Sequence, residues 1–253
     1  MPHSPWSWPP AWVEFALAGV LVSAYAYAAS RHRPTRRQVV CFATGVALLV
    51  AVLATPLATL AHHYLLSAHL VQNVALAEWI PLLLVLGVPS TLATEIGRFR
   101  AVQLLTRPTV ALPLWLAAYA VWHVPAAYDT ALEHHALLHL EHATYLAAGT
   151  LLWWPVLQAS PWNLTAGAKS VYLFVAFVFA SPLGLMLALL PSPIYDFYAE
   201  AHRVWGLTTL EDQQIAGIAM AMSEAIVFFT AFTVYFVRFM AEEEADLGQQ
   251  PHG

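Results

Sequence analysis

Histidines crowd the segment 134–142, which holds four of the twelve histidines in the chain. The segment contains no proline and is rich in Leu and Ala, so it predicts a helix. Residues three, four and seven apart share a helical face, which places His135, His139 and His142 on one stripe and Glu141 on the next. Unpaired polar groups are costly in an apolar environment. The apolar sequence that follows therefore requires partners for these histidines, either other side chains or a metal ion.

Composition identifies the environment of this helix. The chain has 253 residues, of which 60 % are hydrophobic and only 10 % charged, whereas soluble domains carry about 25 % charged residues. The mean hydropathy is +0.62. A single cysteine, Cys41, excludes an intrachain disulfide and a CxxC motif. The chain is thus predicted to be a membrane protein. Its twelve histidines and five methionines are the only side chains present in any number that could bind a metal through nitrogen or sulfur.

Apolar runs define the expected fold, because a membrane span needs about 20 apolar residues. The sequence predicts an all-α, polytopic membrane protein with seven transmembrane helices, covering residues 11–29, 38–54, 64–87, 109–124, 135–157, 169–190 and 213–240. We expect one membrane domain, 1–240, and a disordered cytoplasmic tail, 241–253. The first span has no basic residue before it, so we expect it to be retained rather than cleaved.

Basic residues predict the orientation, since they collect on the cytoplasmic side of a membrane. If the seven helices alternate, nine of the ten basic residues fall on one side, and only Arg203 falls on the other. This distribution predicts an N-terminus outside and a C-terminus in the cytoplasm. The nine are Arg31, Arg33, Arg36, Arg37, Arg98, Arg100, Arg107, Lys169 and Arg238.

The same alternation gathers most histidines at the outer ends of the helices. His69, His139, His142 and Met220 lie five to eight residues into their helices, roughly 8–12 Å below the outer end, and His123 lies slightly above them. Imidazole with thioether suits copper, and thioether favours the cuprous ion, while imidazole alone also suits zinc or iron. These five residues are the predicted metal site. The alternative for each histidine is a hydrogen-bonded residue at the membrane interface.

Acidic residues mark two further positions. Glu78 and Glu224 lie near the middle of their helices at similar depth, where a carboxylate must be neutral, paired or functional. They could meet each other or a basic partner, or be protonated and bonded to a hydroxyl. Asp212, directly before the expected helix at 213, is predicted to cap that helix.

Enzyme signatures are absent from the sequence. It contains no Gly-rich phosphate loop and no GxSxG, and the HLEH run at 139–142 lacks the HExxH arrangement of zincins. Basic patches interleaved with aromatic residues are missing as well, which argues against a nucleic-acid partner. We therefore expect a membrane-embedded protein that is not an enzyme.

Several motifs in this order resemble the CtaG family, the assembly factors of caa(3)-type cytochrome c oxidase. The resemblance covers residues 62–238 and rests on SAHLVQN followed by PLLLVLGVP, on WHVPAAYD, on LHLEHATYLAAGTLLWWPV and on WGLTTLEDQQIAGIAM. It implies a multi-pass protein of a bacterial or archaeal plasma membrane that helps to mature the oxidase by delivering copper to one of its subunits. Matched residue by residue, it implies His69, His123, His139, His142 and Met220 as the site.

Three departures from the family pattern lie near this predicted site. Asn73 stands where the family usually has a second histidine, Glu78 replaces an apolar residue, and Glu224 follows Met220 where Trp and Pro-Gly are usual. These changes predict either a metal site with altered ligands or a non-catalytic structural subunit of a respiratory complex. A membrane cytochrome, with histidines from two helices as axial haem ligands, is the third hypothesis.

Overall fold

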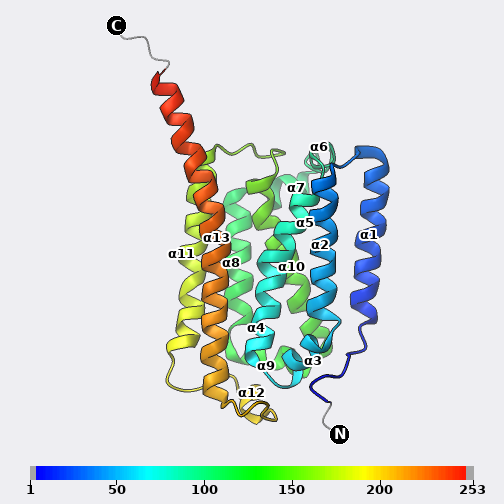
Figure 1. The fold of residues 1–253 in the computed structure, drawn as a ribbon, viewed down its shortest axis with the longest axis vertical. Coiled ribbons are helices and arrows are strands. Elements are labelled where there is room, and N and C mark those ends of the chain that lie inside the picture. The colour runs from blue at the N-terminus through cyan, green and yellow to red at the C-terminus, as the bar shows by residue number, and fades with distance from the viewer. Residues whose placement is uncertain (1–3, 249–253) are drawn as a thin grey trace.

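The computed structural model of the protein describes residues 4–248, and the described part of the chain contains helices but no strands (Figure 1). Six long helices and one interrupted helix form a bundle. The long helices are α1 (Trp12–His32), α2 (Arg36–Leu53), α8 (Pro108–Trp122), α10 (His135–Leu157), α11 (Ala166–Leu189) and α13 (Thr209–Gly248). The interrupted helix consists of α4 (Leu66–Val74), the π-helical turn η1 (Ala75–Trp79) and α5 (Ile80–Gly87).

Each of the seven predicted spans corresponds to one of these helices. Five are long and apolar enough to cross a membrane, and a sixth is added if α8 and the short α9 (Pro125–Glu133), bent by 75° relative to each other, count as one span. By length and composition the chain is therefore a multi-pass helical membrane protein. The helix α10 is not among these candidates, because the histidines and the glutamate in its first turns lower its apolar character. Seven spans, and their orientation, remain predictions.

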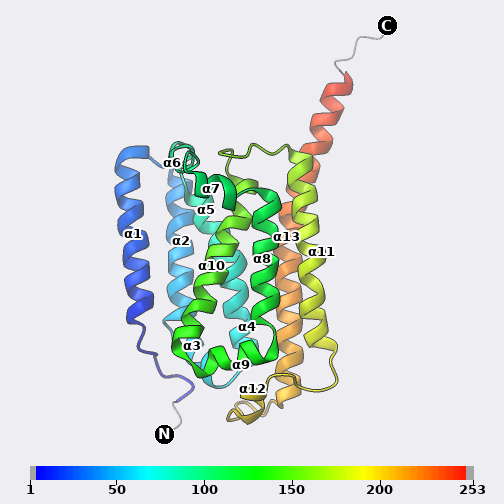
Figure 2. The same ribbon diagram turned by 180° about the vertical axis from the view of Figure 1, so that it is seen from behind.

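Short helices distinguish the two ends of the bundle. Figures 1 and 2 place α3 (Pro56–His63), α9 and α12 (Asp196–Glu200) at the end where α1 begins. The helices α6 (Ser90–Ile96) and α7 (Arg100–Leu105) lie at the opposite end. Histidine-rich turns and most basic residues thus lie at opposite ends, as the predicted alternation requires.

The C-terminal helix is longer than the sequence indicated. The expected domain boundary at residue 240 lies inside α13, which continues to Gly248 and extends beyond the bundle (Figure 1). Residues 241–248 of the expected disordered tail are therefore helical in the structure. The rest of that tail, 249–253, lies outside the described residues.

The interrupted helix occupies the centre of the bundle. Within its span, 72 % of the apolar window is buried, compared with 6 % for α1 at the periphery. Its π-helical turn exposes the carbonyl of Ala77 to its neighbours, and this oxygen accepts a hydrogen bond of 3.2 Å from Nε1 of Trp115. Gly149 of α10 packs on the same carbonyl, since a Cβ atom there would lie 2.2 Å from the oxygen. This close approach fixes the position of α10 against the central helix.

Candidate metal centre

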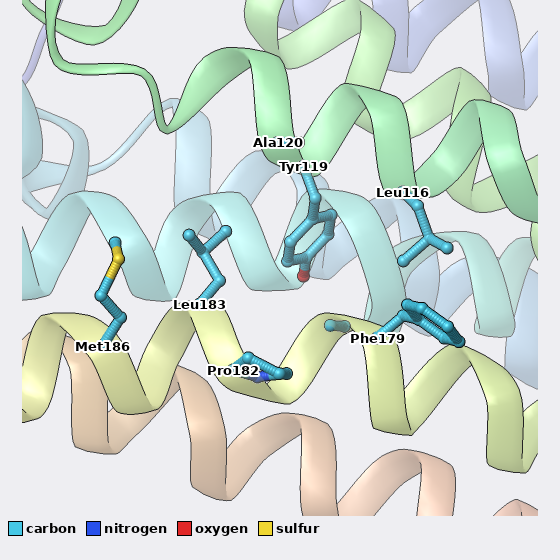
Figure 3. Close-up of a pocket in the computed structure, with 8 residues that line it drawn as sticks. Leu116, Tyr119, Ala120, Phe179, Pro182, Leu183 and Met186 are labelled. Atoms are coloured by element: carbon cyan, nitrogen blue, oxygen red, sulfur yellow. The ribbon is translucent and has the colours of Figure 1, made fainter.

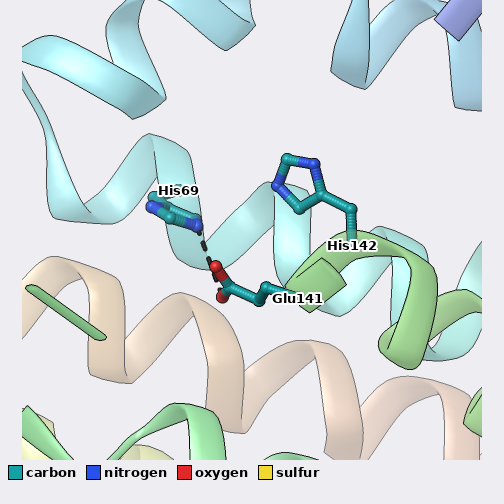
Figure 4. Close-up of side chains that lie close together, drawn as sticks. All are labelled: His69, Glu141 and His142. Carbon is teal, nitrogen blue, oxygen red and sulfur yellow. Dashed lines mark ion pairs between the residues drawn. The ribbon is translucent and has the colours of Figure 1, made fainter. Parts of the chain in front are cut away.

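Three side chains from two helices converge near the end of the bundle that carries α3, α9 and α12. His69 extends from α4, and Glu141 and His142 extend from α10 (Figure 4). One ligand atom from each lies within 4.8 Å of the others, and all three residues are buried. Nε2 of His69 is 3.5 Å from Oε1 of Glu141. Two imidazoles and a carboxylate at these distances could bind one metal ion.

The N-terminus of α4 is held in place by a residue far along the chain. Asp212 of α13 accepts hydrogen bonds from the backbone N–H groups of Leu66, at 2.7 Å, and Ser67, at 3.2 Å. A carboxylate at a helix N-terminus satisfies unpaired N–H groups and is stabilised by the helix dipole. The prediction that Asp212 caps its own helix is wrong, because α13 begins one turn earlier, where Thr208 and Glu211 cap it reciprocally.

Hydrogen bonds assign the tautomer of His69. The Tyr198 hydroxyl donates to the carbonyl of Ala61 and therefore accepts from Nδ1–H of His69, at 2.9 Å. The proton on Nδ1 leaves the lone pair on Nε2, which lies 3.5 Å from Glu141 and has no hydrogen-bond partner among the described residues. An imidazole oriented in this way by a partner on its other nitrogen is the usual arrangement of a metal ligand.

His62 brings a third imidazole to the cluster, and the sequence did not predict it as a ligand. Its ring centroid lies 5.9 Å from that of His69 and 5.7 Å from that of His142. Gln72 donates to the carbonyl of Val52 at 2.7 Å, so its Oε1 accepts from Nε2–H of His62 at 3.1 Å. Burial lowers the pKa of His62 to about 3, which keeps the ring neutral, as a ligand must be. His62 lies on α3 and His69 on α4, so no helical spacing relates the two residues.

Glu141 is the second residue that the prediction did not include among the ligands. Its Oε1 accepts a hydrogen bond of 2.8 Å from Nδ2 of Asn73, while its Oε2 is buried without a partner. Asn73, which departs from the family pattern, therefore orients a carboxylate toward His69. The Nε2 atom of His142 is likewise buried without a partner. Within residues 4–248 the cluster thus contains three buried atoms that lack hydrogen bonds and could donate to a metal.

Two of the five predicted ligands join the cluster, and the others lie apart from it. The side chain of His139 is 43 % exposed, and its Nδ1 lies 3.6 Å from Oε1 of Glu14 on α1. His123 donates from Nδ1 to the carbonyl of Tyr119 at 2.8 Å, and its Nε2 is buried without a partner. The ring centroid of Tyr128 lies 5.1 Å from that of His69 and 6.2 Å from that of His123, so Tyr128 separates His123 from the cluster. Met220 is buried in the hydrophobic core.

Fold and site together define a class of protein: a multi-pass helical membrane protein with a buried cluster of histidines and a glutamate near one end. Residues 22–242 match the family of the cytochrome c oxidase caa3 assembly factor, CtaG. The chain belongs to this family, which confirms the resemblance found in the sequence.

Two curated relatives were found, both uncharacterized proteins, one from Mycobacterium bovis and one from Mycobacterium tuberculosis. Each is 27 % identical to this chain over 182 residues, which cover 62 % of this chain. The matched region spans only 27 % of the length of either relative. No solved structure matches the chain.

Proposed function

We propose that the protein binds a copper ion at His69, Glu141 and His142 and passes it to a subunit of cytochrome c oxidase during assembly of that enzyme. The observation that supports this proposal is the convergence of three buried side chains, His69, Glu141 and His142, each with a ligand atom within 4.8 Å of the others. Each of them also carries a buried atom without a hydrogen-bond partner among the described residues. Such atoms are costly to bury unless something binds them. Membership of the assembly-factor family supports the oxidase as the recipient.

The chemical types of the three proposed ligands restrict which metal ions could bind. Imidazole nitrogen with carboxylate oxygen suits copper, zinc, iron or nickel, and the role of the family in oxidase assembly favours copper as the cargo. His62 supplies a third imidazole within reach, so the ion could change ligands on its way out of the site. The roles of His123 as an assisting residue and of Met220 as a ligand for the cuprous state stay predictions.

The position of the cluster suggests where the ion enters and leaves. In this proposal the end with α3, α9 and α12 faces outside a bacterial or archaeal plasma membrane, and the basic end faces the cytoplasm. Asp129 of α9 accepts hydrogen bonds from the backbone N–H groups of Asp196, at 3.2 Å, and Phe197, at 3.3 Å. These bonds fasten α12 to α9 at the end where the cluster lies. The oxidase subunit would dock at this end and receive the ion there.

A transfer experiment tests this function. Purified protein in mild detergent is loaded with cuprous ion, freed of excess metal and mixed with a copper-free oxidase subunit that carries a copper site. We expect copper to leave the assembly factor and appear in the oxidase subunit. Retention of the ion would contradict delivery, and failure to load would contradict binding.

The two alternatives make different predictions in the same preparation. A membrane cytochrome would show a Soret band in the visible spectrum of the purified protein. A structural subunit would co-purify in fixed proportion with the mature oxidase and would bind no metal. If the protein is a copper carrier, we expect no Soret band and no permanent association with the mature oxidase.

A further inference from the structure

We propose that Glu78 and Glu224 form a proton-binding site in the centre of the bundle, apart from the metal cluster. Glu78 lies on the π-helical turn η1 and Glu224 on α13, and both residues are 0 % exposed. The π-helical turn contacts α13 in the core of the bundle. The sequence left open whether these acids meet each other or a basic partner, and the structure places both in the same part of the core, where the charge of one acts on the other.

Charge balance is the first argument for protons on this pair. The groups that face the carboxyls from the surrounding helices are Tyr119 of α8 and Ser181 of α11, and Tyr145 of α10 packs against Tyr119. None of these groups is positively charged at neutral pH. Two ionised carboxylates would therefore place two negative charges in an apolar interior without a compensating cation, which costs several kcal/mol for each ion. Protonation removes that cost.

Unused hydrogen-bonding atoms are the second argument. The Tyr119 hydroxyl donates to Oε1 of Glu78 at 2.7 Å. The remaining atoms at the site lack partners within the described part of the chain: Oε2 of Glu78, both carboxyl oxygens of Glu224 and Oγ of Ser181. Ionised carboxylates only accept hydrogen bonds, whereas a protonated carboxyl also donates. The hydroxyls of Tyr119 and Ser181 supply two donors for four carboxyl oxygens, and a proton on either acid supplies a third.

Polar and aromatic side chains lie between the pair and the metal cluster. Tyr119 bonds Glu78 through its hydroxyl, and its carbonyl accepts from His123. The hydroxyl of Tyr145 lies 3.4 Å from Nδ1 of His123, and the ring of Tyr128 separates His123 from His69. The backbone carbonyl of Tyr119 cannot pass on a proton, so these contacts place polar groups on the cluster side of the acids but do not form a continuous relay.

The sideways approach to the pair is apolar. Figure 3 shows Tyr119 extending from α8 into a groove beside α11. Its other lining residues are hydrocarbon or thioether, chiefly Leu116, Phe179, Pro182, Leu183 and Met186. Protons do not travel over such a surface, so the groove does not provide a route to Glu78. The polar groups that adjoin Glu78 lie toward His123 instead, and π-helical turns such as the one that carries Glu78 are frequent at functional sites.

Infrared spectroscopy of the purified protein tests the proton site without any metal, so its outcome is independent of copper binding. At neutral pH the wild-type protein should show the C=O stretch of a protonated carboxylic acid, and this band should shift in D₂O. Glu78→Gln and Glu224→Gln should each reduce or remove the band. Tyr119→Phe should keep the band but shift it, because the hydrogen bond to Glu78 is lost, and should slow its exchange in D₂O.

Glu14→Gln is the matched control, because Glu14 pairs with His139 on the side of α1 and should leave the band unchanged. Gln has nearly the shape of Glu, and circular dichroism verifies that each variant is folded. The wild-type spectrum is decisive even if a variant does not fold. Absence of the protonated band at neutral pH, a band that survives in both Gln variants, or a band that never exchanges in D₂O would each overturn the proposal.

Discussion

Asn73 donates a hydrogen bond of 2.8 Å from Nδ2 to Oε1 of Glu141, which joins the central helix to α10. Both residues are buried, and the same carboxylate oxygen lies 3.5 Å from Nε2 of His69. The family resemblance indicated a lost histidine ligand at position 73. In the structure the amide at this position donates to a carboxylate, so Asn73 holds Glu141 next to His69.

Replacing Asn73 with leucine tests this relationship. The Asn73→Leu protein loses the donor that holds Glu141, and the loss of such a supporting bond typically weakens metal binding by about 10–100-fold. Copper affinity measured by competition with a chelator should fall by that factor. The control is Asn163→Leu, at an exposed position in the loop before α11, where affinity should not change. Equal affinities in the two variants would show that Asn73 has no part in the site.

The histidines of α10 provide the second prediction. His142 belongs to the cluster, whereas His139 lies beside Glu14 with its side chain 43 % exposed. Elemental analysis of purified protein should show loss of copper in His142→Ala and full retention in His139→Ala. If His139→Ala lost as much bound copper as His142→Ala, the metal site would include the face of α10 that carries His139, and the proposed cluster would be wrong.

The Tyr198 hydroxyl provides the third prediction, because it accepts the Nδ1–H of His69. Tyr198→Phe keeps the ring and removes only this acceptor, so we expect copper affinity to fall by about 10–100-fold. Tyr195→Phe is the matched control. Tyr195 is equally buried, but its hydroxyl donates to the backbone carbonyl of His123, and its loss should change affinity much less. Identical effects in both variants would argue against a fixed tautomer at His69.

Close packing at the π-helical turn provides the fourth prediction. A Cβ atom on Gly149 would lie 2.2 Å from the carbonyl oxygen of Ala77, so Gly149→Ala should destabilise the fold by about 1–3 kcal/mol, the usual cost of overpacking. Gly19 on α1 has nothing within 4 Å of such an atom, and Gly19→Ala should stabilise the helix by up to about 1 kcal/mol. Unfolding of both variants in detergent measures the difference. A neutral Gly149→Ala would mean that α10 packs less closely than the structure shows.

Much of the fold was predictable, because apolar runs of the required length are a local property of the sequence. The helix at 135–157 has the bounds that the structure gives it. The interruption of the central helix had one local signal, Pro81, because a proline lacks the N–H that would bond the carbonyl of Ala77. The π-helical form of the turn at 75–79 had none. The tail at 241–248 was misjudged because its polar residues are compatible with a helix that continues into solvent.

The site was predictable only in part, for reasons of helical phase and distance along the chain. His69 and His142 were expected and do meet, but a stripe along a helix is broad enough to include His139, which faces α1 instead. The spacing alone could not show that Glu141 rather than His139 faces the cluster. The support of α4 by Asp212 joins residues about 146 positions apart, and no local pattern indicates such a contact.

X-ray absorption spectroscopy of copper-loaded protein, with metal stoichiometry measured on the same sample, tests the central claim most directly. We predict a single copper ion per chain, bound by imidazole nitrogen and carboxylate oxygen, and no retained copper in a His69→Ala, His142→Ala double variant. A wild-type protein that retains no copper, or a double variant that retains as much as the wild type, would contradict the proposed site.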